Sequence, residues 1–196
     1  MSAVSTASPG RVLFVHQSCD LYGSDRVLLD IAEAVAQAGG EPIVALPGEG
    51  PLTLALRSRH IEVHSLGALQ VLKLSRASMT AGGAMRLAAA VPASIASLDR
   101  CVGGRRIDLV HSNTLAVMAG ALWARRRGVR HLWHVHEIVE QPRVAARAFP
   151  WLVRWLSDTV VCNSNATKRW LVQSQPTLAA RSTVVWNGVS AAATQP

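Results

Sequence analysis

The sequence contains little cysteine and no long apolar run. Its three cysteines, Cys19, Cys101 and Cys162, are widely spaced and form no C-x-x-C pair. This argues against a disulfide framework or a structural zinc site and favours a reducing compartment. No stretch approaches the roughly 18 apolar residues of a membrane-spanning helix. Residues 1–10 are small and polar without the apolar core of a signal peptide, so we expect a disordered tail and a cytoplasmic protein.

Several functional signatures are also missing. The chain has no Walker A loop, no G-x-G-x-x-G fingerprint and no G-x-S-x-G nucleophile elbow. Acidic residues are scarce, twelve against twenty Lys and Arg, and the net charge is +8. This charge favours anionic partners such as nucleotide phosphates or acidic lipid headgroups, although a high-GC genome that encodes Arg in place of Lys explains it equally well. Without a helix-turn-helix, RNP or zinc motif, we expect no nucleic-acid partner.

Short apolar segments alternate with segments of helical spacing. Strands are predicted at 12–16, 42–46, 61–66, 107–111, 130–136, 159–162 and 183–186. Helices are predicted at 24–38, 52–59, 77–102, 115–127, 143–156 and 166–173, with interruptions at Gly82-Gly83, Pro92 and Pro150. The alternation is typical of an α/β protein with a doubly wound parallel sheet, here of about seven strands.

Polar residues stand at the ends of four predicted strands. They are His134-Val135-His136-Glu137, His16-Gln17-Ser18, His111-Ser112-Asn113 and Asn163-Ser164-Asn165. In open α/β sheets, ligands bind beside the carboxyl ends of the strands, near a topological switch point. The pattern therefore predicts a functional site at this edge.

Two features of that edge have alternative interpretations. Gly23-Ser24-Asp25 follows the first strand, and Ser24 can cap the next helix; the turn is either an anion site or an ordinary helix start. His134 and His136 share a face of their strand and could bind zinc, but no second acidic ligand follows at a suitable spacing. We expect no metal, a buried and hydrogen-bonded His134, and a His136 that faces the cleft.

A basic and aromatic segment forms a further candidate surface. Arg143, Arg147 and Arg154 alternate with Phe149, Trp151, Leu152 and Trp155, and Arg125-Arg126-Arg127 ends the preceding predicted helix. Such a patch could rest on an anionic membrane surface, at the inner face of the membrane. The alternative is a helix whose Trp face packs on the sheet while its Arg face is solvated.

The order of motifs resembles the amino-terminal domain of family 4 glycosyltransferases, which have the GT-B fold with two Rossmann-like domains. Tyr22-Gly23-Ser24-Asp25-Arg26 resembles the family's G-G-x-E-R turn, and His134-Val135-His136-Glu137 resembles its strand ending in H-D. Within these two motifs, Ser24, Asp25 and Glu137 depart from the family pattern. Three further motifs match. These are Asp108–Asn113 for D-x-[VI]-H-x-[HN], Val160–Ala166 for V-x-x-x-S-x-[AY], and Val184–Val189 for V-I-x-N-G-V-D.

The resemblance implies a retaining, metal-independent hexosyltransferase. A complete enzyme would transfer a sugar from a UDP-, GDP- or ADP-sugar to a hydroxyl acceptor, a lipid or a cell-surface glycan, without a covalently bound cofactor. The implied site residues fall into three groups. Catalytic residues are His136 and Glu137, donor phosphate and sugar contacts are Gly23, Ser24 and Asp25, and acceptor contacts are His16, Tyr22, Arg26, His111, Asn113 and Ser164.

The resemblance also implies a division into domains. We expect residues 11–189 to form the Rossmann-like acceptor-side domain and residues 190–196 a linker or tail. We expect the family's donor-binding domain to be absent from these residues and to act in cis or in trans, and therefore expect the chain alone to be inactive. Two other hypotheses remain open: a non-catalytic Rossmann-like binding or assembly module, and a small metallohydrolase that uses His134 and His136.

Overall fold

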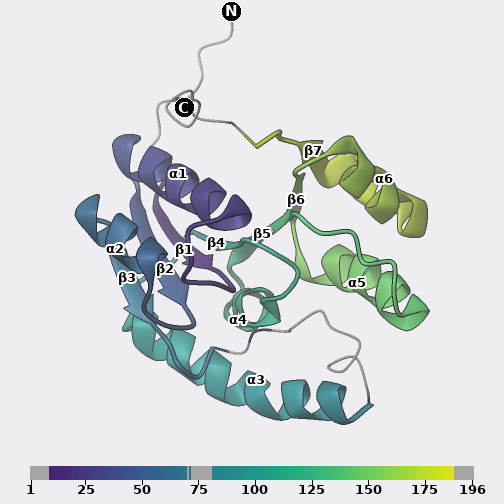
Figure 1. The fold of residues 1–196 in the computed structure, drawn as a ribbon, viewed down its shortest axis with the longest axis horizontal. Helices are drawn as coiled ribbons and strands as arrows, with labels where there is room; N and C mark the ends of the chain where they lie inside the picture. Colours follow the sequence, from purple (N-terminus) through teal and green to yellow (C-terminus); the bar gives the residue numbers. More distant parts are fainter. Residues whose placement is uncertain (1–8, 70, 72–80, 188–196) are drawn as a thin grey trace, which may run out of the picture.

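The computed structural model describes residues 9–69, 71 and 81–187, which form alternating strands and helices (Figure 1). The strands are β1 (Arg11–Val15), β2 (Glu41–Leu46), β3 (Glu62–Ser65), β4 (Leu109–Ser112), β5 (Arg130–Val135), β6 (Thr159–Cys162) and β7 (Ser182–Val184). The helices are α1 (Gly23–Gln37), α2 (Pro51–Ser58), α3 (Ala81–Val102), α4 (Met118–Arg127), α5 (Arg143–Leu156), α6 (Asn165–Ser174) and the 3-10 helix η1 (Pro176–Arg181).

The strands form one parallel sheet in the order β3-β2-β1-β4-β5-β6-β7. The chain winds outward from β1 to β3, crosses back through α3, and continues from β4 to β7 on the other side. In the register, Leu13 of β1 is opposite Ile43 on one side and Val110 on the other. The topological switch point therefore lies between β1 and β4. The predicted fold class, a Rossmann-like doubly wound sheet, is confirmed.

Helices cover the sheet in two layers because both faces of its central strands are apolar. On β1, Phe14 packs with Leu28 of α1 on one face, while Leu13 packs with Leu98 of α3 on the other. Successive side chains of a strand point to opposite faces, so neighbouring residues serve different layers. Figure 1 shows α1 and α3 on opposite sides of β1.

A close approach between α4 and the sheet depends on Gly120. A Cβ atom at this position would lie 2.6 Å from Ser112 Oγ and 3.0 Å from Val15 Cγ2. These distances are shorter than normal van der Waals contacts, so a side chain would force α4 away from β1 and β4. This helix helps to hold the end of β4, which carries part of the candidate site.

Two predicted helix interruptions are wrong. Helix α5 runs through Pro150, which is buried beside Phe149 and Val153, so packing on the sheet outweighs the lost backbone hydrogen bond. Helix α3 likewise runs through Pro92 to the buried Leu98. Gly82-Gly83 lies in its first turn, and residues 77–80 of the predicted helix are outside the described residues, as are 1–8 and 188–196.

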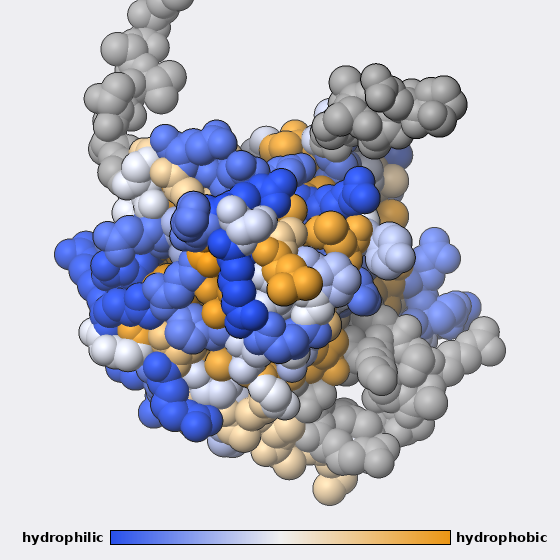
Figure 2. All heavy atoms as spheres, turned by 60° about the vertical axis from the view of Figure 1, so that its left-hand side comes forward, coloured by the Kyte–Doolittle hydropathy of each residue, from blue (hydrophilic) through white to orange (hydrophobic). Residues whose placement is uncertain are grey.

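The boundaries of other elements also shift. Helix α4 begins at Met118, three residues later than predicted, because Leu115, Ala116 and Val117 form a buried turn after β4. Strand β7 ends at Val184, and the sequence pattern did not reveal η1. On the face seen in Figure 2, hydrophilic side chains surround a smaller group of apolar ones. Within the described ranges, no helix is both long and apolar enough to cross a membrane.

Candidate functional site

The carboxyl ends of β1, β4, β5 and β6 bring the four polar strand ends to one edge of the sheet. These strands are consecutive neighbours in the sheet, so residues far apart in the sequence become adjacent. Backbone hydrogen bonds continue the alignment past the strands: Asn113 N–H donates to Val15 O, and Asn163 N–H donates to Val135 O. The edge includes the switch point, where the sequence pattern predicts a site.

A buried histidine–carboxylate pair joins the end of β1 to the start of α1. His16 Nε2 lies 2.5 Å from Oδ1 of Asp25, and both side chains are almost fully buried. Burial opposes ionisation of Asp25, but hydrogen bonds from His16 and the Tyr22 N–H outweigh it and hold the carboxyl pKa below its ordinary value. Asp25 is therefore an anion at neutral pH, and His16 Nε2 carries a proton toward it.

Asn113 connects His16 to the end of β5. Its amide nitrogen donates to Ser24 O at 2.9 Å and lies 3.2 Å from His16 Nδ1. Its amide oxygen lies 3.2 Å from His136 Nε2. One side chain thus links α1, β1 and the loop after β5. Asp25, His16, Asn113 and His136 form a continuous polar chain, which we call the edge network.

The edge network determines the tautomer of His136. A backbone carbonyl only accepts hydrogen bonds, so the Asn113 atom facing Ser24 O is the amide nitrogen, and its oxygen faces His136. That oxygen accepts a hydrogen bond, which places the ring hydrogen on His136 Nε2. The Nδ1 atom of a neutral His136 ring is then left as an acceptor.

Burial keeps three neighbouring imidazoles uncharged. It lowers the pKa of His136 to about 3, with a smaller contribution from the nearby His134 and His16 rings. Burial also lowers the pKa of His134 to about 4 and that of His111 well below its ordinary value. These rings are therefore neutral at pH 7, and a neutral ring both donates and accepts hydrogen bonds.

His111 and His134 lie beneath the edge network. The ring of His134 is 4.1 Å from that of His136 and 5.7 Å from that of His111, which packs on Phe14. His134 is buried as expected, but the expected hydrogen bond is absent: within the described structure both its ring nitrogens lack a partner, as does His111 Nε2. The pleat explains this, because the rings face the apolar layer between the sheet and α1.

Glu137 connects the loops that follow two strands. Its Oε2 accepts hydrogen bonds from the Leu115 and His136 N–H groups, each at 3.3 Å. Burial raises the pKa of this carboxyl despite those bonds. The side chain thus joins the loop after β4 to the loop after β5, next to His136.

The end of β6 supports the same loop through Asn163. Its amide nitrogen donates to His136 O at 3.1 Å, and its amide oxygen accepts from Thr167 Oγ1 at 2.8 Å. Ser164, expected to contact the acceptor, accepts from Thr167 N–H and caps α6. Sequence reasoning did not assign Asn163 a role, although its place directly after a buried strand was a signal.

The turn before α1 differs from the expected cap. The N-cap residue is Tyr22 instead of Ser24, because the Asp25 carboxylate accepts from Tyr22 N–H at 2.9 Å. Gly23 has φ of +36°, and a Cβ atom there would meet nothing within 4 Å, so the backbone is open to a ligand. Tyr22 is 78% exposed, and Arg26 is exposed with its Nε donating to Leu21 O.

Two cavities lie away from this edge. One of about 520 Å³ and one of about 500 Å³ both include Arg130, the first residue of β5, and so lie at the amino edge of the sheet. None of the edge network's residues lines either cavity in the described part of the chain. Nor does that part of the chain contain a group of three or more His, Cys, Asp or Glu side chains suited to a metal ion.

Comparisons with known proteins agree with this architecture. The sequence profile of Glycosyltransferase Family 4 matches residues 22–193. No curated protein matches the chain. The fold is similar to that of HepE from Anabaena in complex with UDP and glucose, with a TM-score of 0.67 and 21% identity over 91% of this chain and 44% of HepE.

Two further solved structures share the fold. A glycosyltransferase from Rickettsia africae has a TM-score of 0.65 and 16% identity over 91% of this chain and 43% of its own. Sucrose-phosphate synthase from Thermosynechococcus elongatus has a TM-score of 0.61 and 13% identity over 91% and 48%. The chain spans less than half the length of these structures and has the architecture of the N-terminal half of a GT-B fold. It belongs to glycosyltransferase family 4.

Proposed function

We propose that this chain is the acceptor-side half of a retaining glycosyltransferase. It would transfer a hexose from a nucleotide sugar to a hydroxyl of a lipid or cell-surface glycan, without a metal ion. The observation that carries the proposal is the edge network, which joins the family's glycine turn to the ends of β4 and β5. A structural core would gain little from four polar side chains gathered at the switch point.

His136 is the residue proposed to contact the transferred sugar. Its ring is half-buried and neutral, and the contact of Nε2 with Asn113 leaves Nδ1 free to accept a hydrogen bond from a sugar hydroxyl. Glu137 contributes by holding the two loops around that ring. This supports a positioning role for Glu137, in addition to the catalytic role that the family resemblance implies.

The start of α1 is proposed to face the donor phosphates. Gly23 and Ser24 lie in the first turn, where free N–H groups and the helix dipole favour an anion. Asp25 does not compete with that anion directly, because its carboxylate is buried against His16 and Tyr22 N–H. HepE in complex with UDP-glucose has the same fold, which supports a nucleotide sugar as donor.

Catalysis is proposed to require a donor-binding domain, in cis or in trans. The edge network would form one wall of a cleft, and transfer would require a second wall to orient the reactants and exclude water. We further propose a cytoplasmic location, supported by three free thiols, two of them buried. Burial raises the pKa of both Cys101 and Cys162 to about 11, so these thiols are inert.

The test combines the chain with a candidate donor-binding domain and follows nucleotide release from UDP-, GDP- and ADP-sugars. We expect release only when both parts are present, and a large loss in the His136→Ala variant. The matched control is His64→Ala, which changes a histidine on β3, away from the edge network. Fast transfer by the chain alone would contradict the proposal that catalysis requires a donor-binding domain. No nucleotide release from any of these sugars, with the partner folded and bound, would favour a non-catalytic binding module.

A further inference from the structure

Helix α5 exposes an apolar stripe to solvent. Val144, Ala148, Trp151 and Trp155 follow one another at intervals of four, three and four residues, which places them on one face of a helix. Val144 is 80% exposed, Trp151 52% and Trp155 51%. The two indole rings lie 6.0 Å apart. Large aromatic side chains that remain exposed side by side indicate a surface that contacts something else.

The stripe is not the core face of the helix. Phe149, Pro150 and Val153 bury that face against the sheet, and they belong to the same cluster as Trp133 and Val160. The sequence left open whether the Trp face packs on the sheet; in the structure it does not. Truncating either Trp would therefore leave the attachment of α5 in place.

Arginines run beside the apolar stripe. Arg143, Arg147 and Arg154 occupy the adjoining face, and the helix has no acidic residue. The Arg154 guanidinium lies over the Trp155 ring, 5.3 Å from its centroid. An exposed helical face with Trp on one side and Arg along its flank has the composition of helices that lie in a membrane interface.

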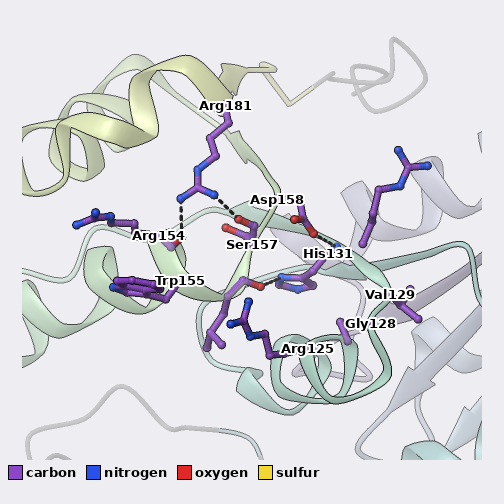
Figure 3. A pocket seen from close by; sticks show the side chains of 12 residues that line it. Arg125, Gly128, Val129, His131, Arg154, Trp155, Ser157, Asp158 and Arg181 are labelled. Carbon is purple, nitrogen blue, oxygen red and sulfur yellow. Dashed lines mark hydrogen bonds between the residues drawn. The ribbon is translucent and has the colours of Figure 1, made fainter.

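Arginines also line the cavity of about 520 Å³ at the carboxyl end of α5 (Figure 3). Arg181 donates there to the Ser157 and Arg154 carbonyls. Arg125 and Arg130 also line the cavity, and within the described ranges their guanidinium groups have no hydrogen-bond or ion-pair partner. Asp158 is the one carboxylate among the lining residues, and its Oδ2 accepts from His131 N–H.

We propose that the exposed face of α5 and these arginines dock on an anionic phospholipid bilayer. Trp151 and Trp155 would lie at the level of the headgroups, since indole rings prefer the interface between water and hydrocarbon. Arg143 and Arg147 would contact lipid phosphates along the helix, and Arg125 and Arg130 would do so at its end. The proposed occupant is argued from charge: Arg143, Arg147 and Arg154 flank the Trp pair along α5, and a phosphate-rich surface complements them.

The experiment is co-sedimentation of the purified chain with vesicles of phosphatidylcholine alone or mixed with phosphatidylglycerol. We expect binding to the mixed vesicles only, weakened by salt. Trp151→Ser/Trp155→Ser and Arg125→Gln/Arg130→Gln should each reduce that binding by about tenfold or more. Trp186→Ser and Arg169→Gln are matched controls, because both change exposed residues outside this surface.

Each remaining outcome overturns the proposal. Equal binding to both kinds of vesicle, no binding to either, or full binding by the double variants would show that α5 is not an anionic-membrane surface. A dimer in sedimentation velocity that the Trp double variant dissolves would assign the stripe to a second copy of the chain. Circular dichroism and a thermal melt of each variant distinguish lost docking from lost folding. No step depends on transferase activity, so the outcome is independent of the proposed function.

Discussion

His16 Nε2 and Asp25 Oδ1 lie 2.5 Å apart, nine residues apart in the chain, with both side chains buried. The pair attaches the carboxyl end of β1 to the first turn of α1. Because Asn113 also contacts His16 and Ser24, the same pair orients the end of β4. Three elements of the candidate site therefore depend on one buried histidine–carboxylate pair.

Replacing Asp25 with Asn should destabilise the fold. The change removes the charge opposite His16 and leaves a buried amide in its place, which should lower the free energy of unfolding by about 1–3 kcal/mol. Urea unfolding at pH 7 measures the difference, with Asp30→Asn as the control because Asp30 is exposed on the same helix. An Asp25→Asn chain as stable as the wild type would show that the pair contributes nothing.

The effect of this substitution should depend on pH in a defined direction. The pKa of Asp25 is lower in the folded state than in the unfolded state, where it is about 3.9. The contribution of Asp25 to the free energy of unfolding is therefore present above that unfolded pKa and is lost as pH falls through the folded pKa. The difference between wild type and Asp25→Asn should therefore shrink below about pH 4.

Asn113 should determine the tautomer of His136. Nitrogen NMR of the imidazole rings should show hydrogen on His136 Nε2 and none on Nδ1 at pH 7, because Nε2 faces the Asn113 amide oxygen. In Asn113→Ala that preference should weaken, while Asn165→Ala, at the exposed start of α6, should leave it unchanged. An Nδ1–H tautomer in the wild type would contradict the orientation assigned to the Asn113 amide.

His134 should make the protein sensitive to mild acid. Its pKa is lowered by burial to about 4, so the unfolded state binds a proton first as pH falls below about 6.5. Because of this residue, the free energy of unfolding of the wild type should fall by about 2 kcal/mol between pH 7.5 and pH 5. His134→Phe should avoid that loss and be more stable than the wild type at pH 5.

The control for that comparison is His60→Gln, because His60 is exposed. It should retain the full loss of stability between the two pH values. Chemical unfolding at pH 7.5 and pH 5 measures all three proteins. If His134→Phe loses as much stability as the wild type, this ring is not responsible for the acid sensitivity.

Gly120→Ala should destabilise the chain by about 1–3 kcal/mol, since the new Cβ would lie 2.6 Å from Ser112 Oγ. Gly82→Ala is the matched control, because Gly82 is exposed in α3 and a Cβ there meets nothing within 4 Å. That control should stabilise its helix by about 0.5–1 kcal/mol. Differential scanning calorimetry distinguishes the two signs, and equal shifts would contradict the close approach of α4.

The local spacing of apolar residues predicted most of the helices and strands, because these elements depend mainly on residues that are neighbours in the sequence. The apolar run 42–46 became part of β2, and the alternation of strands with helices led to the correct fold class. The interruption at Pro150 was predicted incorrectly for the opposite reason. A proline weakens a helix by itself, but burial of Pro150 beside Phe149 stabilises α5, and that burial depends on residues distant in the sequence.

The candidate site shows the same division. The sequence by itself determined which chemical groups stand at the strand ends, because strand boundaries and polar residues can be read locally. Only the tertiary structure decided that Asn113 lies between His16 and His136, since this follows from the neighbouring positions of β1, β4 and β5 in the sheet. Likewise, the sequence contained the two tryptophans of α5, but packing decided which helical face is buried and left them exposed.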